Sequence, residues 1–185
     1  MKMKYKKITT SSDRIIEIYD DVFPQHLRHY HILFVENSKY QLGTTSTLIQ
    51  SQKNKTFFQS RYSEEDIENF NFNHEVFEKK FENYSIGQSW VLASSPLSTY
   101  YYHTDRNNNS NGLTLLYYVN TTWDKEWGGE TLFTNDYGEC EIAVQFKPGR
   151  VVIFDSLIEH KPSAISMSAD EFRFIFVIQF VLNQT

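Results

Sequence analysis

Leu113-Thr114-Leu115-Leu116-Tyr117-Tyr118-Val119 is the stretch of sequence that decides the fold. It is short, it is rich in β-branched and aromatic residues, and turn residues bound it, as is typical of a strand. Similar segments recur as far as the C-terminus. The eight candidates are residues 90–93, 100–102, 113–119, 130–133, 140–146, 151–154, a stretch after His160, and residues 172–182. Eight strands at this spacing predict a double-sheet jelly roll.

The first third of the chain has a different pattern, which predicts helices and irregular structure. Ser11-Ser12-Asp13 can cap a helix through Ile15 and Tyr19 that is interrupted by Pro24. A second helix is expected to begin at Ser63, which forms a capping box with Asp66, and to end before Gly87. The expected fold class is therefore mainly β with N-terminal helices (α+β), around a double-stranded β-helix (jelly-roll) core of about eight strands.

Length and composition limit the alternatives. At 185 residues and 21.9 kDa, one domain over residues 1–185 is expected, with a helical or irregular support region at 1–87 and a jelly-roll catalytic core at 88–182. The net charge of -5 gives no basic field for nucleic acid, so a nucleic-acid partner is not expected. The single cysteine, the lack of a signal-peptide pattern and the lack of a long apolar run predict a soluble cytoplasmic protein with no membrane association.

His103-Thr104-Asp105, followed by His160, is the candidate metal-binding pattern. If His103 and Asp105 lie on one strand, their side chains point to the same face and can reach one ion. Two imidazoles and one carboxylate leave about half of an octahedral metal's positions open, the facial arrangement that ferrous oxygenases use. Taken alone, the tripeptide is also compatible with ordinary histidines and with an aspartate that belongs to a turn.

Several further segments make the chain resemble the 2-oxoglutarate/Fe(II)-dependent dioxygenases, in particular their prolyl 4-hydroxylase-like branch. The resemblance extends over about residues 88–182. The segments that carry it are residues 101–105, 116–120, 123–131, 147–155, His160 and residues 173–178. Their order and spacing look like those of the family, and together they are more specific than the three candidate ligands alone.

The resemblance implies a role for five residues. His103, Asp105 and His160 would be the iron ligands. Arg173 would pair with the distal carboxylate of 2-oxoglutarate, a task that suits a planar, permanently charged guanidinium. Tyr118 would help to hold the cosubstrate; core packing by Tyr118 or its neighbour Tyr117 is the alternative, since only one of two adjacent strand residues faces the site.

Two departures from the family and two motifs remain. Arg173 lies 13 residues after His160, slightly farther than the family's usual spacing. Some prolyl hydroxylases have a further cosubstrate tyrosine in the first barrel strand, where this chain has Ala93, Ser94 and Ser95. The segment from Trp123 to Glu130 contains paired glycines that permit a tight turn and two tryptophans, for which a structural role is expected, with substrate stacking as the alternative. The histidine-rich tract His26, His29 and His31 is expected to be a solvated helix end, and His74 a surface residue.

The reaction implied by the resemblance is hydroxylation of an unactivated C–H coupled to conversion of 2-oxoglutarate to succinate and CO2. The cofactors would be Fe(II), 2-oxoglutarate and O2, with ascorbate as a candidate reductant. A prolyl residue in a protein or peptide is the first substrate choice. The alternatives are a free amino acid or other small molecule, and a non-catalytic metal-binding jelly-roll module; the acidic charge balance disfavours an oxygenase that repairs nucleic-acid bases.

Overall fold

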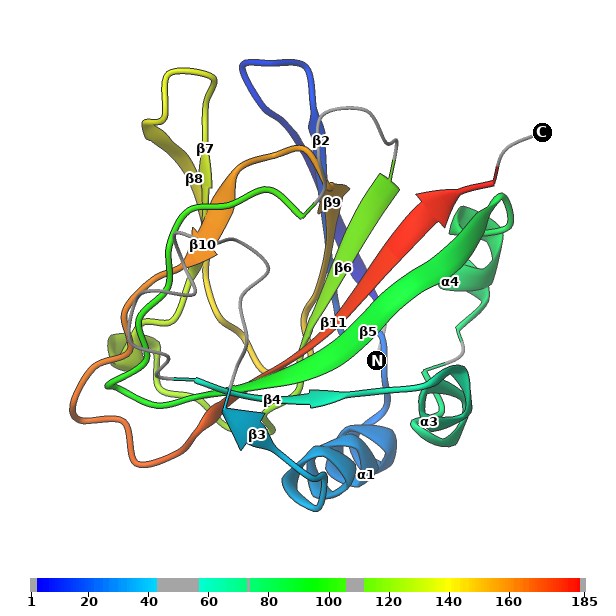
Figure 1. The fold of residues 1–185 in the computed structure, drawn as a ribbon, viewed down its shortest axis with the longest axis vertical. Coiled ribbons are helices and arrows are strands. Elements are labelled where there is room, and N and C mark those ends of the chain that lie inside the picture. Colours follow the sequence, from blue (N-terminus) through cyan, green and yellow to red (C-terminus); the bar gives the residue numbers. More distant parts are fainter. Residues whose placement is uncertain (1–2, 43–56, 73, 106–111, 184–185) are drawn as a thin grey trace.

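The structure is a computed structural model that describes residues 3–42, 57–72, 74–105 and 112–183. Figure 1 shows the order of its elements. They are β1 (Lys4–Thr9), β2 (Ile15–Asp20), α1 (Gln25–Glu36), β3 (Gln41–Leu42), β4 (Phe58–Arg61), α3 (Glu64–Asn69), α4 (Glu75–Lys80), β5 (Tyr84–Ser94), β6 (Gly112–Tyr118), the short 3-10 helix η1 (Lys125–Trp127), β7 (Thr131–Thr134), β8 (Cys140–Val144), β9 (Val151–Asp155), β10 (His160–Pro162) and β11 (Arg173–Leu182).

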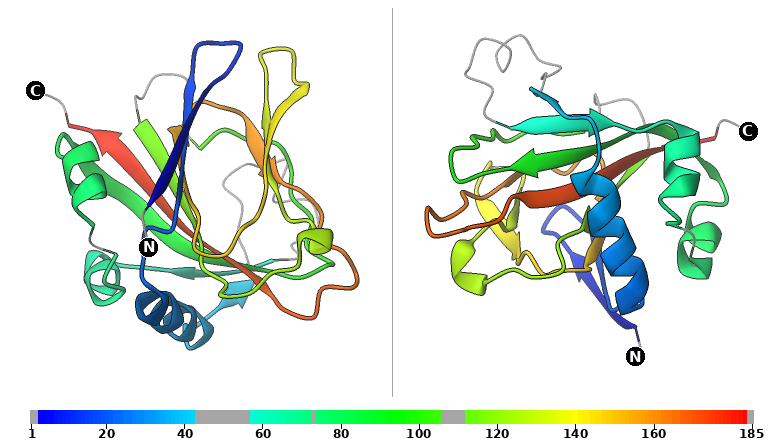
Figure 2. Two further views of the ribbon diagram at one scale, coloured as in Figure 1. Left: turned by 180° about the vertical axis from the view of Figure 1, so that it is seen from behind. Right: turned by 90° about the horizontal axis from the view of Figure 1, so that it is seen from below.

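The strands form two antiparallel sheets. The large sheet has the order β1-β2-β9-β6-β11-β5-β4-β3, and the small sheet has the order β10-β7-β8. Figures 1 and 2 show helices α1, α3 and α4 on one side of the large sheet and the small sheet on the other. The predicted mainly β fold with a jelly-roll core is confirmed.

Strand β6 shows how the sequence builds two cores on the two faces of one sheet. Leu115 and Tyr117 pack with the helices, whereas Leu116 and Tyr118 pack in the space between the two sheets. All four side chains are buried, because both faces of this central strand are covered. The interior between the sheets is therefore lined by alternate residues of β6, β9 and β11.

The prediction of a helix through Ile15 and Tyr19 is wrong, because this segment is strand β2. Residues 10–14 form the turn of a hairpin: the amide of Thr10 donates to the Arg14 carbonyl over 2.8 Å, and Asp13 has a positive φ of 58°. Turns favour the same Ser and Asp residues that cap helices. The region 1–87 thus adds β1 to β4 to the large sheet, and β5 itself begins at Tyr84.

The helix predicted from Ser63 exists with its capping box, but it is divided into α3 and α4. Asn71, with a φ of 53°, ends the first part. None of the helices in the described part of the chain has an apolar stretch long enough to cross a membrane. The strand predicted at residues 100–102 is absent; there the chain runs beside the sheets and forms only an isolated bridge between His103 and His160.

Candidate metal centre

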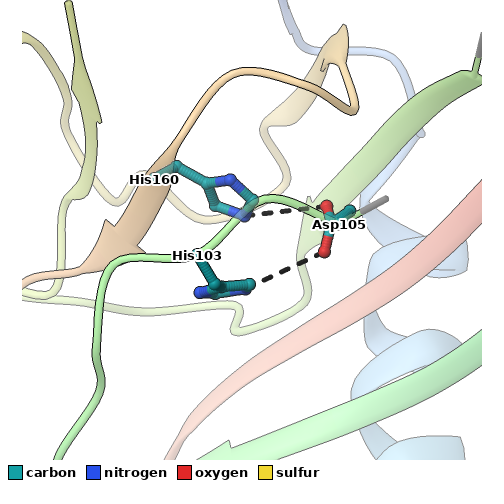
Figure 3. A group of neighbouring side chains, drawn as sticks. All are labelled: His103, Asp105 and His160. Atoms are coloured by element: carbon teal, nitrogen blue, oxygen red, sulfur yellow. Dashed lines mark ion pairs between the residues drawn. The ribbon is translucent and has the colours of Figure 1, made fainter. Parts of the chain in front are cut away.

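Three side chains that are distant in sequence converge between the sheets. One donor atom from each of His103, Asp105 and His160 lies within 4.8 Å of those of the other two. His103 Nε2 is 3.8 Å from Asp105 Oδ1, and His160 Nε2 is 3.7 Å from Asp105 Oδ2 (Figure 3). In the described ranges, no other group of three His, Cys, Asp or Glu side chains comes this close.

Backbone hydrogen bonds fix the relative positions of the three residues. His103 and His160 exchange two of them, over 3.0 Å and 2.9 Å, and the amide of Asp105 donates to the Ser156 carbonyl over 3.0 Å. His160 is the first residue of β10, while His103 and Asp105 lie on an extended segment outside any strand. The bridge therefore aligns the candidate ligands in place of the continuous strand that was predicted.

The orientation of both imidazoles leaves Nε2 facing the cluster. His103 Nδ1 is 2.9 Å from the Tyr101 carbonyl, and His160 Nδ1 is 3.0 Å from the Ile158 carbonyl. Since a carbonyl only accepts, Nδ1 carries the proton in each ring and Nε2 has a free lone pair. Burial lowers the pKa of His160 to about 4, which keeps this ring neutral, the form that binds a metal.

Asp105 is held by a residue that sequence reasoning missed. Thr114 donates a hydrogen bond of 2.6 Å to Asp105 Oδ2, and its hydroxyl also lies 3.2 Å from that of Ser156. Both hydroxyls are fully buried. In the sequence, Thr114 is one β-branched residue among many in a predicted strand, so nothing distinguished it from a packing residue.

Arg173 occupies the first position of β11 and is only 1% exposed. Its Nε and Nη2 atoms are buried without a hydrogen-bond partner among the described residues, and its guanidinium lies 5.3 Å from the centre of the Phe146 ring. Burial lowers its pKa, whereas Tyr100, Tyr118 and Glu130 act in the opposite direction. Buried donors without a partner of this kind can bind an anion.

Tyr118 lies between the sheets on the same side as Arg173, as expected from the alternation of β6. Its hydroxyl is 2.7 Å from that of Thr131, and its ring stacks on Phe146 at 4.6 Å. Tyr117 points the other way and hydrogen-bonds to His31 over 3.0 Å. Of the two tyrosines, only Tyr118 is near the guanidinium.

The Trp-Gly-Gly segment packs directly on Arg173. Gly129, with a φ of 82°, lies so close that an added Cβ would be 3.0 Å from Arg173 Cδ, and an added Cβ on Gly128 would be 2.7 Å from the Ala164 carbonyl. The Trp123 indole donates to the Gly128 carbonyl over 3.0 Å and contacts Phe146. The motif therefore shapes the wall beside the arginine, in agreement with the structural role expected for it.

The histidine tract and His74 differ from the expectation. His26 and His29 lie at the surface, but His31 is completely buried and stacks on Phe70 at 4.4 Å. Burial lowers the pKa of His31 to about 4. His74 is half-buried and caps α4, with its ring accepting from the amide of Val76. Both are structural residues: His31 packs against residues that are distant in sequence, and His74 caps the start of a helix.

Comparison with known proteins gives a match to the part of the chain that contains the candidate site residues. Residues 89–178 match the sequence profile of the 2OG-Fe(II) oxygenase superfamily. No curated protein sequence matches the chain.

Among solved structures, a prolyl hydroxylase from Trichoplax adhaerens in complex with a hypoxia inducible factor peptide fragment is similar, with a TM-score of 0.70 at 14% identity over 90% of this chain and 83% of that one. The viral collagen prolyl hydroxylase of Paramecium Bursaria Chlorella virus-1, solved with 2OG, has a TM-score of 0.61 at 13% identity over 91% and 96%. HygX from Streptomyces hygroscopicus, solved with nickel and 2-oxoglutarate, has a TM-score of 0.66 at 8% identity over 90% and 82%. The profile match covers just under half of the chain and the fold is shared, so residues 89–178 are similar to the 2OG-Fe(II) oxygenase superfamily.

Proposed function

We propose that the protein is an Fe(II)- and 2-oxoglutarate-dependent dioxygenase that hydroxylates an unactivated C–H bond, with a prolyl residue in a protein or peptide as its substrate. The observation that carries the proposal is the buried guanidinium of Arg173, whose Nε and Nη2 have no hydrogen-bond partner among the described residues. It packs on Phe146, and His160 packs on Phe154, two rings of the same core between the sheets. A jelly roll that only held a metal would have no use for such a charge, because burying it without a partner is costly. A dicarboxylate cosubstrate supplies that partner.

The residues fit the two groups that the family name implies. The Nε2 atoms of His103 and His160 and the carboxylate of Asp105 would hold Fe(II), a donor set of two imidazoles and one carboxylate. Arg173 would pair with the far carboxylate of 2-oxoglutarate through its planar fork, with Tyr118 beside it. When bound, Fe(II) and 2-oxoglutarate supply the oxidising power that inserts an oxygen atom from O2 into a C–H bond, with release of succinate and CO2.

The chain itself contributes orientation and a dry environment. The carbonyls of Tyr101 and Ile158 keep both imidazoles in the tautomer that presents Nε2. The rings of Phe133 and Phe154 pack against His160 at 5.9 Å and 4.7 Å and keep water from that side. Water exclusion strengthens every electrostatic interaction within the site.

The likeness of the fold to prolyl hydroxylases supports the choice of a prolyl substrate: one of them was solved in complex with a peptide fragment, and another is named a collagen prolyl hydroxylase. Peptides rich in proline are therefore the first set to screen, for a mass gain of one oxygen atom. If no peptide of the set gains an oxygen atom but a free amino acid does, the substrate is a small molecule and not a peptide.

The cosubstrate is tested first and independently of the substrate. Wild-type protein with Mn(II) under anaerobic conditions is expected to bind 2-oxoglutarate by calorimetry. With Fe(II), ascorbate and O2 it is expected to form succinate slowly without substrate, and His103→Ala is expected to abolish this. Absence of 2-oxoglutarate binding in the wild-type protein would overturn the oxygenase function and favour a non-catalytic metal-binding module.

A further inference from the structure

A groove lies on the outer face of the large sheet, away from the candidate metal centre. It has a volume of about 730 Å³ and lies between α1, β4 and the segment that leads into β11. Phe58 and Phe174 both pair with Ala93 in the sheet register, so the three side chains share one face. The next pair along, Arg173 and Ser94, points to the opposite face. The sheet therefore separates the groove from the guanidinium of Arg173.

Buried apolar residues form the floor of the groove, and large exposed residues form its rim. Ile32 and Ala93 are 8% and 5% exposed. Leu33, Phe58 and Phe172 also line the groove, but they are 45%, 42% and 46% exposed. Large apolar side chains that stay exposed around a hollow mark a surface that contacts another molecule. The two aromatic rings of the rim are of the kind that protein interfaces favour.

Three exposed carboxylates accompany the apolar lining. They belong to Glu36, Asp170 and Glu171, and none of them forms an ion pair with a residue in the described ranges. The hydroxyl of Thr122 donates to Glu171 Oε1 over 2.7 Å and holds this carboxylate at the groove. Of the described lining residues, only His29 has a side chain that can become a cation. The groove therefore combines an apolar floor with an excess of negative charge at its edge.

We propose that this groove docks a basic segment of a partner protein, in which a large apolar side chain lies beside a lysine or arginine. The apolar side chain packs on the floor between Ile32 and Ala93, and the cation pairs with the carboxylates of Asp170 and Glu171. Complementary charge of this kind selects the partner and speeds its association. A chain segment fits better than a small molecule, because small-molecule sites enclose most of their ligand, whereas the exposed rim can contact further residues along a chain.

The test measures the binding of short fluorescein-labelled peptides to the full-length protein by fluorescence anisotropy, at low salt and with a chelator present. One peptide alternates lysine and leucine, a second has glutamate in place of lysine, and a third has serine in place of leucine. The lysine–leucine peptide is expected to bind, and each of the others should bind at least about tenfold more weakly. The chelator excludes binding through a metal ion.

Two variants alter the two halves of the groove separately. Phe58→Thr removes a ring from the rim and keeps a β-branched residue in β4, and it should weaken the lysine–leucine peptide about tenfold. The double variant Asp170→Asn, Glu171→Gln keeps the shapes of both side chains and should weaken it about fivefold, an effect that high salt removes. Tyr137→Thr and Glu139→Gln are the matched controls, because both are exposed between β7 and β8 of the small sheet, and they should change nothing.

Several outcomes would overturn the docking site while leaving the proposed function intact. They are failure of the lysine–leucine peptide to bind the wild-type protein, equal binding of the glutamate peptide, and equal losses in the variants and their controls. Phe172→Thr, which removes the other ring of the rim, repeats the test outside β4 in case Phe58→Thr does not fold. Sedimentation of the protein alone is the last arm: self-association that either ring variant abolishes would replace the partner protein by a second copy of this chain.

Discussion

Replacement of Arg173 by methionine is expected to change stability and cosubstrate binding in opposite directions. Methionine has a similar volume and no charge, so it fills most of the same space while removing the buried donors. Two of these, Nε and Nη2, have no hydrogen-bond partner in the part of the chain that the structure describes. Ligand-free Arg173→Met should therefore be more stable than the wild-type protein, whereas its affinity for 2-oxoglutarate should collapse.

The magnitudes follow from the surroundings of the guanidinium. A buried unpaired polar group costs about 1–3 kcal/mol, and the contact with Phe146 at 5.3 Å returns about 0.5–2 kcal/mol. The net gain in the free energy of unfolding should be about 1 kcal/mol. Loss of a bidentate pair with a carboxylate, at about 1.5 kcal/mol or more for each bond, should raise the Kd of 2-oxoglutarate at least about a hundredfold.

Urea unfolding in the presence of a chelator measures the first quantity, and anaerobic calorimetry with Mn(II) measures the second. Arg150→Met is the control, since Arg150 is paired with Asp20 at 2.8 Å. Burial would raise the pKa of Asp20, but its hydrogen bonds with Arg150 and Lys147 hold it below its usual value. The control should lose about 1–2 kcal/mol of stability and keep its 2-oxoglutarate affinity. Equal destabilisation of both variants, or an unchanged Kd in Arg173→Met, would refute the reasoning.

Three further predictions concern other parts of the molecule. Thr114→Val removes the hydrogen bond to Asp105 and should weaken Mn(II) about 10–100-fold in a metal titration while the fold persists; an unchanged Kd would exclude this positioning role. The unfolded chain binds a proton at His31 below about pH 6.5, whereas the folded chain binds it only near pH 4. When urea unfolding is repeated at pH 4 instead of pH 7.5, the free energy of unfolding should therefore fall by about 3 kcal/mol more for the wild-type protein than for His31→Phe. Equal losses would contradict the neutral buried ring. Gly129→Ala and Gly138→Ala both strain a positive φ by about 1–2 kcal/mol, but only the first meets the arginine of β11, so calorimetry should show weaker 2-oxoglutarate binding for Gly129→Ala alone.

The strands after residue 88 were largely predictable because alternation is a local signal. Leu116 and Tyr118 face one core and Leu115 and Tyr117 the other, as a period of two requires. The same signal failed at Ile15, where Ser and Asp residues suit a hairpin turn as well as a helix cap. The pairing of β2 with β1 in the hairpin and with β9, more than a hundred residues away, distinguishes the two.

The candidate site was predictable to the extent that its residues carry distinctive chemistry. The sequence singled out His103, Asp105, His160 and Arg173 through the resemblance of the surrounding segments to a known family, and their roles stay a prediction. Thr114 was missed, since it looks like any other strand residue until its partner is known. Buried partners that come from distant segments leave no local pattern in a single sequence.

The reciprocal hydrogen bonds between His103 and His160 also bear on how the protein resists proteolysis. These residues are 57 positions apart (160 − 103), and a metal bound to both would act as a removable cross-link that closes the intervening loop. Loss of the ion would leave backbone hydrogen bonds to hold that closure, the two of the bridge and the one from Asp105 to Ser156. Occupancy of the centre would then set the lifetime of the protein as well as its activity.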